Sequence, residues 1–173
     1  MDDSEKNKSD VEQAGEDLFN FAIDRDDTKW LLSRLPPECN VKPGKVEYEL
    51  QILKIISVGW SIPYFLENSP LKTPLLELYW QSFQEFSAGI NETTGLMTGI
   101  DIDYFQLVKD RLDTYVSAMS GNSGKQEPAA VIGPEFAGAC GNKEDIFARM
   151  TGTKMFVAAV DGVREYLEAI KWI

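Results

Sequence analysis

Apolar residues recur every three or four positions along most of this chain, which is the spacing of one face of an α-helix. The longest such segment covers residues 46–67, where two apolar stripes overlap: Val46, Leu50, Leu53 and Trp60 on one, and Ile52, Ile55, Gly59, Ile62 and Leu66 on the other. A helix that is apolar around most of its circumference is normally enclosed by other helices. We therefore expect residues 46–67 to form a central, buried helix.

Shorter segments repeat the helical spacing on both sides of this one. They cover residues 10–23, 28–35, 73–90, 101–120, 142–152 and 153–170. Between them we expect a turn over residues 91–99 and a helix end at Gly152, because glycine commonly follows the last turn of a helix. The alternation typical of strands is confined to one short stretch, residues 129–132. The pattern predicts an all-α fold, a single-domain bundle of six to seven helices.

The two ends of the domain are also visible in the pattern. Residues 1–9 carry no apolar periodicity, so we expect a disordered acidic N-terminus followed by one helical domain over residues 10–173. Residues 120–127 are rich in glycine and polar residues and are the best candidate for a flexible linker. Too few residues follow them to build a second core, so the linker is expected within one domain.

The net charge of −11 is concentrated at one end: residues 1–27 hold ten Asp and Glu against three Lys and Arg. This balance disfavours nucleic acid and anionic membrane surfaces as partners, because both repel acidic proteins. A protein partner remains possible by charge, and a basic protein would complement the acidic end. The alternative is that the acidic segment only increases solubility. The sequence has no apolar run long enough to span a membrane.

Histidine is absent from all 173 residues, and there are only two cysteines, Cys39 and Cys140. Without histidine the chain has no imidazole base, no Ser-His or Cys-His nucleophile pair and no histidine-ligated metal. We expect no cofactor. Two widely separated cysteines indicate free thiols in the reducing cytoplasm.

Carboxylates are the remaining candidates for chemistry. Magnesium prefers oxygen ligands, and carboxylates from facing helices can bind the metal together with a phosphorylated substrate. The weak candidates are Asp103, Asp110, Asp113, Glu85 and Glu92. Helix capping and solvation explain the same residues without any metal. A magnesium-dependent all-α hydrolase acting on a phosphorylated small molecule is therefore the alternative hypothesis.

Two aromatic residues, Trp80 and Tyr64, lie off the main apolar stripes of their segments. If exposed, they would mark a partner surface or a homodimer interface. The leading hypothesis is a non-enzymatic protein-interaction module of the adaptor, regulator, inhibitor or chaperone type. A structural homo-oligomer is a third hypothesis, which predicts that Trp80 and Tyr64 meet their symmetry-related copies.

Overall fold

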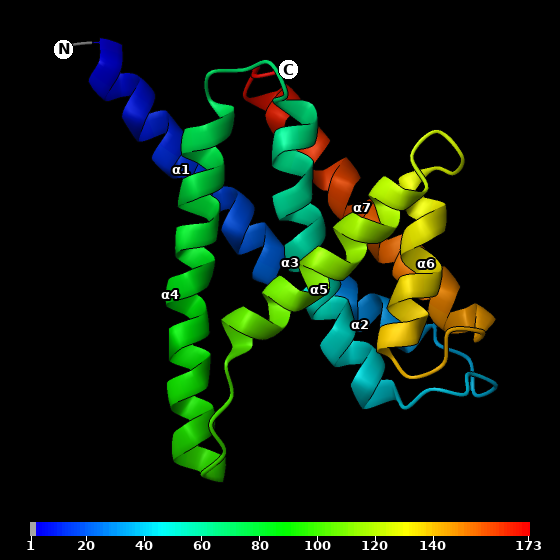
Figure 1. Ribbon diagram of the computed structural model, residues 1–173. Coiled ribbons are helices and arrows are strands. Elements are labelled where there is room, and N and C mark those ends of the chain that lie inside the picture. The colour runs from blue at the N-terminus through cyan, green and yellow to red at the C-terminus, as the bar shows by residue number, and fades with distance from the viewer. Residues whose placement is uncertain (1–2) are drawn as a thin grey trace.

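The computed structural model describes the backbone of residues 3–173 and the side chains from Asp10 onward. Over that range the chain forms seven helices and no strand (Figure 1). They are α1 (Asp3–Ile23), α2 (Asp26–Ser33), α3 (Pro43–Phe65), α4 (Lys72–Thr98), α5 (Tyr104–Gly121), α6 (Pro128–Ala139) and α7 (Ile146–Ala169). The predicted all-α class is confirmed.

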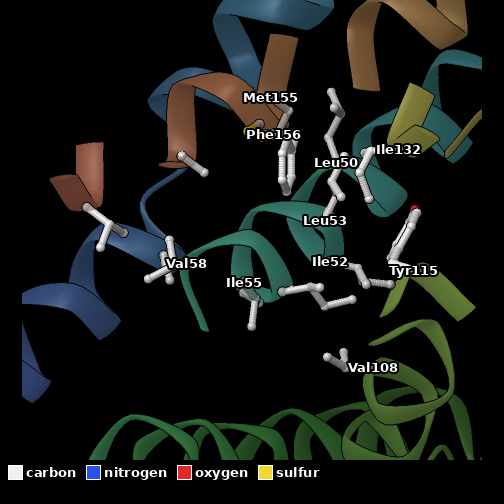
Figure 2. Packing of buried hydrophobic residues seen from close by; sticks show 14 of the residues in the cluster. Leu50, Ile52, Leu53, Ile55, Val58, Val108, Tyr115, Ile132, Met155 and Phe156 are labelled. Atoms are coloured by element: carbon white, nitrogen blue, oxygen red, sulfur yellow. The ribbon is translucent and has the colours of Figure 1, made fainter. Parts of the chain in front are cut away.

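Helix α3 is the centre of the domain, as the sequence pattern predicted. It contacts each of the other six helices. Figure 2 shows side chains of α5, α6 and α7 gathered around it, among them Val108, Ile132 and Phe156. Residues 52–59 are buried without interruption, which explains why this part of α3 has no solvent-facing polar side.

Two charged side chains on α3 are nevertheless fully buried, Glu49 and Lys54. A charge in such a place is stable only with partners that replace water. The Lys54 ammonium lies 3.0 Å from the Asp27 carboxylate and donates to the Asp24 carbonyl oxygen at 3.0 Å. It also lies 4.5 Å from the centre of the Phe21 ring, so it ties the α1–α2 turn to α3.

The helices begin where the local chemistry favours a first turn. Pro43 and Pro128 occupy the start of α3 and α6, where a missing N–H costs nothing. Asp103 and Asp145 cap α5 and α7, accepting the N–H groups of Gln106 at 3.0 Å and Ala148 at 2.8 Å.

The predicted turn over residues 91–99 was wrong. Helix α4 continues through these residues and ends only at Gly99, which has φ +69 and donates its N–H to the Gly95 carbonyl oxygen. The left-handed conformation needed for this cap is the one that glycine adopts without strain. The last turns of α4 are helical even though none of their residues is buried, and this is why the apolar spacing did not predict them.

The predicted helix end at Gly152 was also wrong, because α7 runs unbroken from Ile146 to Ala169. Gly152 is buried against α6, and a Cβ atom there would lie 2.5 Å from Phe136 Cγ. The residue allows two helices to approach each other closely instead of ending one. Residues 129–132, the one strand candidate, lie within α6.

At the N-terminus α1 is helical from Asp3, seven residues before the expected start. Disorder of residues 1–9 stays a prediction. Residues 1 and 2 of this segment lie outside the described part of the chain. Residues 122–127 connect α5 to α6, and these two helices pack together. Flexibility of the 120–127 segment also stays a prediction.

Candidate partner-binding surface

Three of the five carboxylates suggested for magnesium binding make local hydrogen bonds. Asp103 caps α5, Asp110 accepts a hydrogen bond from Gln106 Nε2 at 2.8 Å, and Glu85 accepts one from Gln81 Nε2 at 3.3 Å. Asp113 and Glu92 are exposed. Over residues 10–173 no three acidic or cysteine side chains lie close enough to hold a metal ion. The structure therefore gives the magnesium hypothesis no support.

The buried polar cluster is built around Glu49. Its carboxylate accepts two hydrogen bonds from Arg111 on α5 and lies 3.3 Å from Lys45 Nζ. The hydroxyl of nearby Tyr115 is buried without a partner among the described residues. Burial raises the pKa of Tyr115 well above its usual value, so the phenol stays neutral at any physiological pH. The cluster joins α3 to α5.

A hollow of about 840 Å³ lies between α4 and the start of α5. Two residues that the sequence singled out, Trp80 and Glu85, both line it. The full lining is Leu76, Glu77, Trp80, Gln81, Gln84, Glu85, Ala88 and Phe105. The hollow thus combines an apolar floor with carboxylates and amides, which is the composition of many binding sites.

Trp80 is half-buried because its ring packs on α3. A Cβ atom on Gly59 would lie 2.5 Å from Trp80 Cζ2, so only glycine leaves room for the indole. Tyr79 and Phe83 meet the ring edge-on, at centroid distances of 5.1 and 5.8 Å. These contacts hold the ring in one orientation, and they make core packing part of its role.

The far end of α4 exposes a second feature, which the sequence reading missed. Leu96 is 83% exposed, Met97 81% and Ile100 59%. Figure 1 shows this end of α4 extending beyond the rest of the domain before the chain turns back toward α5. The sequence did contain a sign of this feature. The segment expected to be a turn holds Leu96 and Met97, and Ile100 follows directly after it, whereas turns are normally polar. We call Leu96, Met97 and Ile100 the α4 end cluster.

Tyr64 is exposed, at 58%, as the partner-surface hypothesis required. Its ring stacks on Trp60 with centroids 4.8 Å apart, at the end of α3. Together with Pro63, Phe65 and Glu67 these rings line a shallow hollow of about 630 Å³. Tyr64 and Trp80 do not line a common hollow, so they give no single predicted interface.

A further hollow, of about 440 Å³, lies between α3 and the last half of α4. Its walls include Tyr48, Ile90, Thr94 and Tyr104. Positions 90, 94 and 97 are spaced four and three apart, so Met97 of the α4 end cluster continues the row that lines this hollow. Met97 is therefore on the face of α4 that lines this hollow, although it is not itself one of the lining residues.

The cysteines are free thiols. Cys140 is buried, and burial followed by the Glu49 carboxylate raises its pKa to about 12. Cys39 is half-buried and lies 3.5 Å from Asp145 Oδ1, with a raised pKa that burial chiefly causes. Neither thiol is activated as a nucleophile, because both pKa values move away from neutrality.

Comparison of the chain with family models, curated proteins and solved structures finds no match. Among the described residues, no helix has the length and apolar character needed to cross a membrane. Any assignment of function therefore depends on the surface described above.

Proposed function

We propose that this protein is a non-enzymatic protein-interaction module, of the adaptor, regulator, inhibitor or chaperone type, and that it binds its partner along α4. The observation that carries the proposal is the α4 end cluster. Three large apolar side chains within five residues of sequence are exposed at and just after the end of α4, which extends beyond the rest of the domain. Exposed apolar groups gathered in this way are typical of surfaces that bind another protein.

The energetic reason is the hydrophobic effect. Burying a large apolar side chain against a partner contributes about 1.5–3 kcal/mol. The core itself is well formed, with Leu50, Phe83 and Phe136 all enclosed, and Leu96 and Met97 are more exposed than the other large apolar residues on the surface, such as Ile146 at 60%. The α4 end cluster is therefore not the result of a poorly formed core.

A reducing compartment, the cytoplasm, fits this proposal. Cys39 and Cys140 are both free, and the domain is stabilised by its helical core without a disulfide. The magnesium-dependent hydrolase is not proposed further, because its carboxylates have structural partners or lie apart from any cluster. The oligomeric state of the parent protein and of the variants tests the homo-oligomer hypothesis.

The test compares two matched triple variants in cells that express the protein. Leu96→Ser/Met97→Ser/Ile100→Ser removes the α4 end cluster. Ile146→Ser/Met150→Ser/Val157→Ser removes three exposed apolar side chains from the outer face of α7 and is the control. Both variants should keep the helical circular dichroism and the oligomeric state of the parent protein, since these side chains contribute little to the core.

Quantitative mass spectrometry of co-purified proteins is the readout. The proposal predicts that the proteins retained by the parent and by the α7 variant fall about tenfold or more with the α4 variant, a loss equivalent to roughly 1.4 kcal/mol. Equal retention by all three proteins would contradict it. A parent that is dimeric, with a monomeric α4 variant, would favour the homo-oligomer instead.

A further inference from the structure

We infer that the hollow between α4 and α5 binds a cationic segment of the protein partner, with a lysine or arginine side chain packed on Trp80 between Glu77 and Glu85. The inference rests on the proposed function, because the hollow and the α4 end cluster lie on the same helix. It adds the chemical class of the partner and a second contact site.

The shape of the hollow suits an extended or helical segment rather than a small molecule. Seven of its eight lining residues come from one face of α4, and Phe105 from α5 closes the other side. Glu77 and Glu85 are two helical turns apart, which is about 12 Å along the axis. A peptide lying along α4 could place basic side chains beside both carboxylates while its apolar side chains cover Leu76 and Phe105.

The residues around the hollow carry a negative charge that a cationic segment would complement. Between Lys72 and Lys109 the chain has no lysine or arginine, and it has five acidic residues: Glu77, Glu85, Glu92, Asp101 and Asp103. The nearer of the two flanking cations in sequence, Lys72, donates to the Glu67 carbonyl oxygen at 3.1 Å. Neither Glu77 nor Glu85 pairs with a basic side chain among residues 10–173, since the ion pairs found there involve other carboxylates. The local field therefore favours a positively charged partner.

The Trp80 ring provides an aromatic surface for a cationic side chain. Indole is the aromatic ring that attracts lysine and arginine most strongly through its face. Gly59 and Tyr79 hold this ring in place, so binding costs it little conformational freedom. The hollow thus offers an ordered aromatic surface flanked by two carboxylates that have no basic partner among residues 10–173.

The probe is a fluorescein-labelled amphipathic peptide of leucine, alanine and arginine, compared with the same peptide carrying glutamate in place of arginine. Binding to the full chain is measured by fluorescence anisotropy at low and at physiological ionic strength. The arginine peptide should bind, more tightly at low salt, and the glutamate peptide should not. Equal binding of both peptides, or of neither, would overturn the inference.

A matched pair of variants separates the hollow from the general acidity of the chain. Glu77→Gln/Glu85→Gln should weaken arginine-peptide binding by about fivefold, because two charge contacts of ordinary strength are lost. Glu12→Gln/Glu16→Gln makes the same change of net charge on two exposed residues of α1 and should weaken it less than about twofold. An equal loss with both pairs would overturn the inference, since attraction would then be non-specific.

Failure of this inference is distinguishable from failure of the proposed function. If the arginine peptide does not bind but the α4 end cluster still retains a partner in cells, only the cationic class is wrong. If the cluster retains no partner either, the interaction-module proposal fails as well.

Discussion

Arg111 on α5 binds the Glu49 carboxylate of α3 through two hydrogen bonds, from Nε to Oε2 at 3.0 Å and from Nη2 to Oε1 at 2.9 Å. Glu49 is fully buried, whereas Arg111 remains 27% exposed. The hydrogen bond to Glu49 raises the pKa of Arg111 above its usual value, so the guanidinium stays charged. The pair fixes α5, and with it the connection from α4, against the central helix.

Arg111→Met is expected to destabilise the domain by about 2–3 kcal/mol. Removing one partner leaves a buried carboxylate, and the cost is at the low end because Lys45 remains nearby and Arg111 is partly exposed. Urea unfolding measures the change. Arg164→Met, which breaks an exposed pair with Asp161, is the control and should cost no more than about 0.5 kcal/mol.

A second variant distinguishes the buried charge from lost packing. Adding Glu49→Gln to Arg111→Met removes the uncompensated charge and should recover part of the stability. If Arg111→Met costs no more than Arg164→Met, the pair does not have the structural role described here.

Asp145 predicts a pH dependence of stability. Burial raises the pKa of this carboxyl, but hydrogen bonds from the Ala148 and Asn40 N–H groups and from Cys39 outweigh it, so the pKa lies below its usual value. A carboxyl with a depressed folded-state pKa contributes stability above its unfolded pKa, near 3.9, and loses it as the pH falls through the lower folded value.

Asp145→Asn should therefore lower stability by about 1 kcal/mol at pH 7, because a single amide oxygen cannot serve both N–H groups. The difference from the parent should shrink as the pH falls below about 4. Thermal unfolding across this range measures it, with exposed Asp113→Asn as the control. A difference that does not change with pH would contradict the assignment.

Gly152→Ala tests the close contact between α6 and α7. Alanine normally stabilises a helix by about 1 kcal/mol relative to glycine, but here its Cβ would overlap the Phe136 ring and should cost about 1–3 kcal/mol net. Gly89→Ala on α4 is the control, since nothing lies within 4 Å of its Cβ position, and it should stabilise the domain. A stabilising Gly152→Ala would show that the two helices are less closely packed.

The cysteines should react at very different rates with a thiol reagent. With its pKa near 12, Cys140 carries a thiolate in roughly one molecule in ten thousand at pH 8, and it is also buried. The folded protein should therefore modify at Cys39 first, and Cys39→Ser should react only on unfolding. Rapid labelling of folded Cys39→Ser would show that Cys140 is accessible.

The core of the fold could be predicted from sequence because it depends on periodicity. The two apolar stripes of residues 46–67 correctly identified the central helix. The errors occurred at glycines, since one residue type serves both helix ends and close helix contacts. Gly152 was interpreted as an end, yet what decides its role is Phe136, which comes from a different helix.

The candidate surface was only partly predictable for a similar reason. Trp80 and Glu85 were singled out separately, but their common hollow depends on how α5 crosses α4. Glu49 and Arg111 are 62 positions apart in the sequence, so no local sequence pattern could predict that they pair. The sequence shows only that Glu49 is a charged residue in a mostly apolar segment, and it does not show which residue pairs with it.

Site-specific photocrosslinking tests the central claim, that α4 binds a protein partner, most directly. Benzoylphenylalanine replaces Met97 in the α4 end cluster or, as a control, Glu12 on the exposed face of α1, and both proteins are irradiated in cells. Partner binding along α4 predicts a discrete adduct of higher mass from position 97 that is absent from position 12 and lost when Leu96→Ser and Ile100→Ser are added. No adduct from position 97, or the same adducts from both positions, would contradict it.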